Sequence, residues 1–150
     1  MSAAGPTVTA TFAVRPGRWP DDEPRLRAIR HRVFVVEQRV PEEIEWDGID
    51  AQCRHMIAED ARGDAIGCGR LLPDGYIGRL AVLEAWRGKG VGAALLDRLV
   101  TLAVELGHPR VMLNAQTHAL AFYARSGFTP CGDPYEEAGI LHQAMARTLR

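Results

Sequence analysis

Apolar positions recur along this chain with two different periods, which together predict an alternating order of strands and helices. Short runs rich in β-branched and apolar residues predict seven strands, over Thr7–Val14, Arg54–Ala61, Ala65–Leu72, Tyr76–Leu83, Arg110–Gln116, Phe128–Cys131 and Gly139–Thr148. Arg15-Pro16-Gly17 is expected to end the first strand, and Gly132–Ala138 is expected to form turns.

Spacings of three and four residues predict helices between these strands. Leu26, Ile29, Val33 and Val36 give one apolar face to a helix that begins near Asp21 and stops at Pro41. A second helix is expected over Val91–Leu106, with Leu95, Leu99, Leu102 and Leu106 on one face, and a short third helix over His118–Arg125. This order predicts an α/β fold with a mixed, mostly antiparallel sheet flanked by helices. We expect residues 1–150 to form one domain.

Composition narrows the possible partners without naming one. The formal net charge is −1, and no stripe of basic and aromatic residues appears, so a nucleic-acid partner is not expected. No apolar run reaches the ~20 residues that a membrane span needs, and the first residues lack the pattern of a signal peptide. We therefore expect a cytoplasmic protein.

The three cysteines, Cys53, Cys68 and Cys131, are far apart in the sequence. An odd number of cysteines without a signal peptide favours a reducing compartment over disulfide bonds. No Cys or His pair has the spacing of metal ligands, so no metal is expected. None of the cysteines shares a motif with a base, which argues against a covalent cysteine intermediate.

The run RGKGVG at Arg87–Gly92, just before the second helix, suits a phosphate site; the alternative is a plain connection between a strand and a helix. Residues without side chains let backbone N–H groups approach phosphate oxygens, and the helix N-terminus adds positive potential. A P-loop would need Ser or Thr after Lys89, where this chain has Gly90. The run also matches a dinucleotide fingerprint formally, but three predicted strands precede it and the next strand carries no acidic residue.

The segments around this loop resemble the GNAT N-acetyltransferases. The strand IGRLAV ends at Val82, RGKGVG fits the family's R/Q-x-x-G-x-G/A loop, and VMLNAQ and HALAFYARSGF follow in the family's order. RHRVFVVEQRVP, Arg54-His55 and YEEAGILHQAM resemble the ElaA-like branch more narrowly. Leu141 is a departure from that branch, which often has proline there.

The resemblance implies that acetyl-CoA lies between two central parallel strands that splay apart, Ile77–Val82 and Val111–Gln116. The backbone of Leu80, Ala81 and Val82 would pair with the pantetheine arm, as an added strand does. Arg87, Gly88, Lys89, Gly90, Val91 and Gly92 would hold the diphosphate, and Asn114 would add a polar contact. The alternative for Asn114 is that it satisfies local backbone groups.

Direct transfer of an acyl group to an amine requires an acid and a base. An amine with a pKa near 10 is only about 0.1% neutral at pH 7, which corresponds to roughly 4 kcal/mol. The resemblance places Tyr123 as the acid that protonates the departing thiolate and contacts the cofactor; its alternative is a core aromatic. Glu37 and His142 are the candidate bases, and each has a structural alternative.

The acceptor site is the least defined part of the prediction. Arg30 or Arg32 would bind an anionic group, although a solvated helix face explains these arginines as well. Gln116 would orient the substrate or the thioester carbonyl, and Glu37 and His55 are further candidates for contact with the acceptor. The acidic stretch from Glu42 to Asp50 favours a cationic acceptor instead. We expect acetylation of a primary amine on a small molecule or peptide in a ternary complex, with a homodimer possible. The alternative is a non-catalytic acyl-CoA-binding module.

Overall fold

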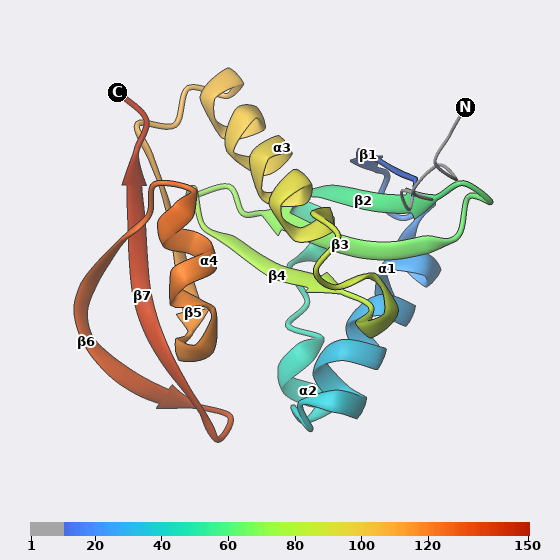
Figure 1. Ribbon diagram of the computed structural model, residues 1–150, viewed down its shortest axis with the longest axis horizontal. Helices are drawn as coiled ribbons and strands as arrows, with labels where there is room; N and C mark the ends of the chain where they lie inside the picture. The colour runs from blue at the N-terminus through green and yellow to red at the C-terminus, as the bar shows by residue number, and fades with distance from the viewer. Residues whose placement is uncertain (1–10) are drawn as a thin grey trace, which may run out of the picture.

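The computed structural model describes residues 11–150, and its strands form two sheets (Figure 1). The first sheet contains, in order, β1 (Phe12–Gly17), β2 (Arg54–Asp60), β3 (Ala65–Leu71) and β4 (Ile77–Val82). In the second, β7 (Ile140–Thr148) lies between β5 (Arg110–Gln116) and β6 (Thr129–Glu137). All neighbouring strands within each sheet are antiparallel, which confirms the expected fold class.

Helices cover both faces of the first sheet. The helical segments are α1 (Glu23–Arg30), the π-helix η1 (His31–Glu37), α2 (Glu42–Glu45), η2 (Asp50–Gln52), η3 (Glu84–Trp86), α3 (Val91–Glu105), η4 (Thr117–Ala119) and α4 (Leu120–Arg125). In Figure 1, α3 crosses one face of this sheet, α1 and α2 lie on the other, and α4 lies against the second sheet.

Within residues 11–150, the backbone bridge between the two sheets lies at the beginning of β4 and β5. Tyr76 and Met112 form a single parallel bridge, and the Met112 N–H donates to the Gly75 carbonyl over 3.1 Å. Beyond this bridge the two strands diverge, as the resemblance implied (Figure 1). Beyond the bridge, the facing edges of β4 and β5 therefore do not pair with each other.

One apolar core joins the two sheets through α3. Leu95, Leu96 and Leu99 on α3 are fully buried against Val111 of β5 and Met145 of β7. A smaller cluster around Leu26 and Ile29 packs α1 on the opposite face of the first sheet. Leu106 was predicted on the buried face of α3, but α3 ends at Glu105 and Leu106 is exposed.

The first strand differs from its predicted range. Its described part runs to Gly17, through the Arg15-Pro16-Gly17 segment that was expected to end it, while residues 7–10 lie outside the described residues. Because β1 is an edge strand, the missing N–H of Pro16 leaves no gap in the sheet. The Arg15 side chain also holds this strand to its surroundings through Asp22 and Glu59.

The predicted first helix is two segments instead of one. After α1 the chain widens into the π-helix η1, in which the extra residue per turn rotates later positions off the buried face. Leu26, Ile29 and Val33 are buried as predicted, whereas Val36 is 47% exposed. Turns of this kind often occur at functional sites.

The segment Gly132–Ala138, predicted as turns, instead belongs mostly to β6. The pairing of β6 with β7 shifts register between Cys131 and Tyr135, which indicates a bulge. The Gln143 side-chain amide stabilises it by donating to the carbonyls of Cys131 and Gly132 at 3.0 and 2.9 Å. Proline and glycine therefore interrupt this edge strand without ending it.

Candidate acyl-transfer site

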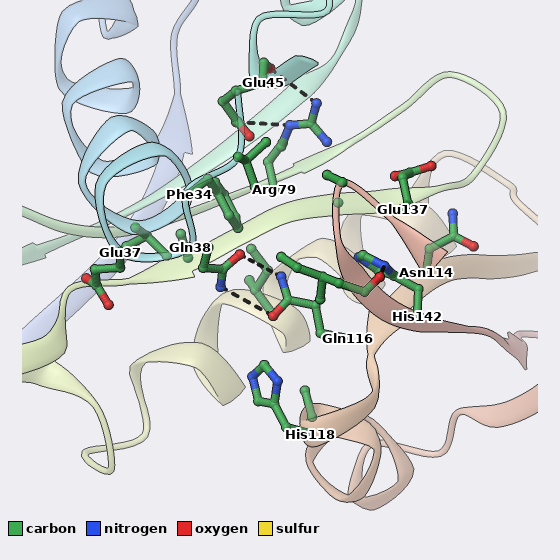
Figure 2. Close-up of a pocket in the computed structure, with 18 of the residues that line it drawn as sticks. Phe34, Glu37, Gln38, Glu45, Arg79, Asn114, Gln116, His118, Glu137 and His142 are labelled. Carbon is green, nitrogen blue, oxygen red and sulfur yellow. Dashed lines mark hydrogen bonds and ion pairs between the residues drawn. The ribbon is translucent and has the colours of Figure 1, made fainter. Parts of the chain in front are cut away.

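The divergence of β4 and β5 opens a cavity of about 550 Å³. We call it the central cavity. Its lining comes from η1, β4, β5, η4, α4 and the β6–β7 hairpin: Val33, Phe34, Glu37, Gln38, Val40, Ile44, Glu45, Gly78–Val82, Arg87, Asn114, Gln116, His118, Ala119, Tyr123, Glu137, Ala138, Ile140 and His142. Segments far apart in the sequence thus meet around one space (Figure 2).

At one end of the cavity the Arg87–Gly92 loop leads into α3. Gly88 and Gly90 have left-handed φ angles of 75° and 86°, a conformation that side chains other than glycine rarely adopt. No heavy atom lies within 4 Å of a Cβ built at either position, so the loop leaves space for a ligand. Gly90 is the N-cap of the 15-residue α3, whose first N–H groups point toward this space. The loop therefore fits a diphosphate.

β4 carries a bulge where it borders the cavity. Cys68 pairs with Ala81 and Arg70 with Gly78, so Gly69 faces both Arg79 and Leu80. Arg79 has a φ of 50°, a left-handed value that is strained for a residue with a side chain. The bulge therefore lies in the part of β4, Gly78–Val82, that lines the central cavity.

Tyr123 of α4 lines the central cavity and belongs to an aromatic cluster. Its ring packs edge-to-face on Phe122 and Phe128, with centroids 5.0 and 6.1 Å away. Burial raises the pKa of Tyr123 to about 12. The hydroxyl donates to no other residue in the described range 11–150, so its proton is available to a ligand.

Polar side chains of the second sheet line the other wall. Gln116 of β5 lies opposite His142 of β7, which lies opposite Tyr135 of β6, so the three form a row across the sheet. The His142 Nδ1 atom lies 2.7 Å from the Ile140 carbonyl, which can only accept, so Nδ1 carries a hydrogen and the acceptor of the neutral ring is Nε2. The ring is further held by stacking on Tyr135.

A reciprocal pair of amides bridges the cavity. Gln38, which follows η1, donates to Gln116 Oε1 over 3.3 Å, and Gln116 donates back to Gln38 Oε1 over 2.7 Å (Figure 2). Gln38 was missed from the sequence because its position after η1 gives no sign that β5 lies opposite. Only the tertiary structure brings these two residues together.

Glu37 also lines the cavity, but its carboxylate is already paired. Arg87 Nη2 lies 2.9 Å from Glu37 Oε2, and Arg87 Nε donates to the Val82 carbonyl over 3.0 Å. Both side chains are partly exposed. The candidate base and the candidate phosphate-binding arginine are therefore in direct contact.

A buried group of ion pairs lies beside the cavity. Its members are Arg30, Glu45, Asp47, Asp50, Arg70 and Arg79. Arg30 Nη1 donates to Asp50 over 2.7 Å, and Arg30 Nε donates to Glu45 over 2.8 Å. Arg79 Nε lies 3.0 Å from Glu45 Oε2 but out of line for a hydrogen bond, so this contact is an ion pair only. The group ties α1 and the 42–50 segment to the β4 bulge.

Charge compensation keeps this group ionised. Burial opposes the charge on Asp50, yet hydrogen bonds and the charges of Arg30 and Arg70 lower its pKa. Burial likewise opposes the charge on Arg30, and its bonds to Asp50 and Glu45 raise its pKa overall. Removing one partner would leave an unpaired buried charge, which costs about 3–5 kcal/mol.

Three residues predicted for the acceptor site do not line the central cavity. Arg30 is 1% exposed within the ion-pair group, so it does not reach an acceptor as expected. Arg32 borders a different groove, between α1 and the segment around Leu83. His55 is buried against Trp19, its Nε2 donates to the Asp50 carbonyl, and burial lowers its pKa.

The remaining described side chains do not indicate other chemistry. Cys53 and Cys68 are buried, and burial raises the pKa of the Cys68 thiol to about 12, which makes it a poor nucleophile. Within residues 11–150, no three His, Cys, Asp or Glu side chains are grouped to hold a metal ion. No helix in the same range is long and apolar enough to cross a membrane.

Solved structures place the two-sheet fold and its cavity in a known class, the acyl-CoA N-acyltransferases. An acyl-CoA N-acyltransferase from Pseudomonas aeruginosa matches with a TM-score of 0.79 and 31% identity, over 93% of this chain and 99% of that one. The crystal structure of Escherichia coli ElaA matches with a TM-score of 0.80 and 32% identity, over 91% and 99%.

Sequence comparison gives the family. The acetyltransferase (GNAT) domain model matches residues 22–149. ElaA of Escherichia coli K12 is 36% identical over 132 residues, 83% of this chain and 86% of ElaA. The uncharacterised N-acetyltransferase YjcF of Bacillus subtilis 168 is 35% identical over 123 residues, 79% and 87%. The chain belongs to the GNAT acetyltransferase family, in its ElaA-like branch, and is an acyltransferase that uses an acyl-CoA.

Proposed function

We propose that the protein transfers an acetyl group from acetyl-CoA to a primary amine, which attacks the thioester directly in a ternary complex. The observation that carries this proposal is the central cavity itself. It extends from Arg87, the first residue of the loop that leads into α3, along the free edge of β4 to Tyr123 and His142. One continuous space thus serves a long cofactor and a nucleophile.

The cofactor side of the cavity supports the proposal through its backbone. The diphosphate would accept hydrogen bonds from N–H groups of the Arg87–Gly92 loop, where Gly88 and Gly90 leave open space. The pantetheine arm would pair with the edge of β4 at Leu80–Val82, and Asn114 lies across the cavity. Backbone recognition explains why glycine is required here.

Tyr123 is proposed as the acid for the leaving group. When the amine attacks the carbonyl, the bond to sulfur breaks and the thiolate needs a proton. Because the pKa of Tyr123 is raised to about 12, its hydroxyl stays protonated at all physiological pH values. It therefore always holds the proton that the thiolate takes.

His142 is proposed as the base that makes the amine neutral, directly or through a water. Its Nδ1 hydrogen is committed to the Ile140 carbonyl, which leaves the Nε2 lone pair as the only acceptor on the ring. Glu37 is the second candidate, but Arg87 holds its carboxylate. This contrast favours His142 for the proton and leaves a different role for Glu37.

The test is release of free thiol from acetyl-CoA across a panel of primary amines, with CoA binding measured by calorimetry on the same preparation. We expect CoA to bind and at least one class of amine to release thiol above the rate of hydrolysis. CoA binding without release across a broad panel would favour a non-catalytic binding module. Absence of CoA binding would contradict the proposal altogether.

A further inference from the structure

The side chain of Arg87 is bonded to two groups beside the proposed cofactor site. Its Nε donates to the Val82 carbonyl on the free edge of β4, and its Nη2 pairs with Glu37. Arg87 is also the first residue of the diphosphate loop. An acyl-CoA bound as proposed would therefore compete with Val82 and Glu37 for this guanidinium.

The competition favours the diphosphate. Its oxygens carry more negative charge than one carboxylate and match the fork of donors on a guanidinium. The Arg87 and Glu37 side chains are 43% and 27% exposed, and exposed pairs of this kind are weak. The existing ion pair is thus readily exchanged for a ligand.

The backbone at Glu37 is anchored, so its side chain is the part that can move. Next to it, Gln38 is tied to Gln116 by two hydrogen bonds and its own N–H donates to the Val33 carbonyl over 3.1 Å. Figure 2 shows Gln38 directed toward Gln116 and the Glu37 carboxylate directed away from that pair. Arg87 holds the Glu37 carboxylate in that outward position.

Glu37 differs from the other carboxylates of the central cavity. Glu45 is buried and already balances Arg30 and Arg79, so it has no charge to offer a ligand. Glu137 is exposed at the end of the β6–β7 hairpin. Glu37, whose side chain is 27% exposed, is instead paired with the first residue of the cofactor loop, where a released carboxylate could hold a positively charged amine.

We propose that Arg87 masks Glu37 in the free protein and that the diphosphate of acyl-CoA takes over Arg87. The released Glu37 then binds the ammonium group of a cationic acceptor. This inference rests on the proposed function and specifies its substrate class, an amine that arrives protonated.

Calorimetric titration of CoA into wild type and Glu37→Gln tests the masking. Removal of the competing carboxylate should tighten CoA binding by about two- to fivefold. Glu84→Gln is the matched control, because Glu84 is an exposed carboxylate near the same loop that forms no ion pair with Arg87 within residues 11–150. Its effect on CoA binding should be smaller.

Two further arms separate masking from a general change in charge. In an Arg87→Gln background, Glu37→Gln should no longer tighten CoA binding. Pantetheine, which lacks the diphosphate, should bind wild type and Glu37→Gln equally. Unchanged CoA binding in Glu37→Gln would overturn the inference, because Glu37 would then not compete for Arg87. Weaker binding would overturn it too, because Glu37 would then preposition Arg87 for the cofactor.

The acceptor arm uses whichever amine the wild type acetylates fastest. Glu37→Gln should raise KM for that amine at least about tenfold, as expected when one charge-assisted contact of a bound ammonium is lost. An unchanged KM for the amine would overturn the assigned role of Glu37. If wild type binds no CoA, the proposed function fails instead, and the two failures are distinguishable.

Discussion

Tyr123 is the residue on which the proposed chemistry depends most directly. Its ring is fixed by Phe122 and Phe128, while its hydroxyl faces the central cavity without a partner in the described residues. A phenol in this position acts as an acid only while it holds its proton. Burial secures that condition by raising its pKa to about 12.

We therefore predict that Tyr123→Phe lowers kcat about a hundredfold, the lower end of the effect of a positioned acid, because a thiolate is a good leaving group. CoA affinity should stay within about twofold, since the aromatic packing is kept. Steady-state kinetics and calorimetry measure the two quantities, with Tyr76→Phe as a control outside the cavity. Unchanged kcat in Tyr123→Phe would rule out the acid role.

The pH dependence of kcat gives a second reading on the same residue. Because the pKa of Tyr123 is raised, deprotonation of this acid should cause no fall in wild-type kcat between pH 8 and 10. A fall in that range that disappears in Tyr123→Phe would mean that the hydroxyl ionises far more easily than its burial implies.

At the scale of elements, the β4 bulge depends on the absence of a side chain at Gly69 in β3. A Cβ at this position would lie 2.7 Å from Leu99 Cδ1 and 3.0 Å from Leu80 Cδ1. Leu99 is fully buried in the core, so it has little room to move away. Gly69 thus lets α3 pack directly over the bulge.

Gly69→Ala should destabilise the fold by about 1–3 kcal/mol, the usual cost of overpacking a core. Gly78→Ala is the matched control, because a Cβ on that neighbouring strand meets no atom within 4 Å. Urea unfolding monitored by circular dichroism gives both free energies. Equal stability of Gly69→Ala and wild type would show that α3 can shift away from the sheet.

At the scale of the whole molecule, Asp22 connects β1, α1 and the turn between them. It precedes α1, pairs with Arg15 of β1 at 2.9 Å, and accepts from the Arg18 N–H at 2.8 Å. Hydrogen bonding from Arg15 lowers the pKa of Asp22 from 3.8 to about 2. Its stabilising effect is therefore present above pH 4 and is lost as the pH falls from 4 to 2.

Asp22→Asn should lower the free energy of unfolding at pH 7 by about 1–2 kcal/mol, which is less than the full pKa shift implies because Arg15 is partly exposed. The variant should also lose less stability than wild type between pH 4 and pH 2. Asp21→Asn is the control, because Asp21 is the adjacent carboxylate in the sequence and is exposed. The prediction fails if both variants follow the wild-type acid profile.

Local patterns were enough to predict most of the elements. The predicted ranges of β2 to β5 and of α3 agree with the structure to within one residue, because each has a clear period and a glycine or proline just before or just after it. The glycine loop was predicted for the same reason, since the chain alone carries its glycines and the helix that follows. Gly88 and Gly90 adopt left-handed φ angles, and predicting this conformation required no knowledge of distant residues.

Distant contacts decided what the local patterns left open. Arg30 looked like part of a basic helix face, and only the folding of the 42–50 segment beneath it turned this arginine into the partner of Glu45 and Asp50. The π-helix turned Val36 outward, and a bulge carried β6 through residues that favour turns. The contacts of Glu37 with Arg87 and of Gln38 with Gln116 join residues 50 and 78 positions apart. The sequence alone therefore determined most of the elements and the glycines of the Arg87–Gly92 loop. The tertiary structure decided which side chains meet across the cavity, because such contacts depend on how sheets and helices pack.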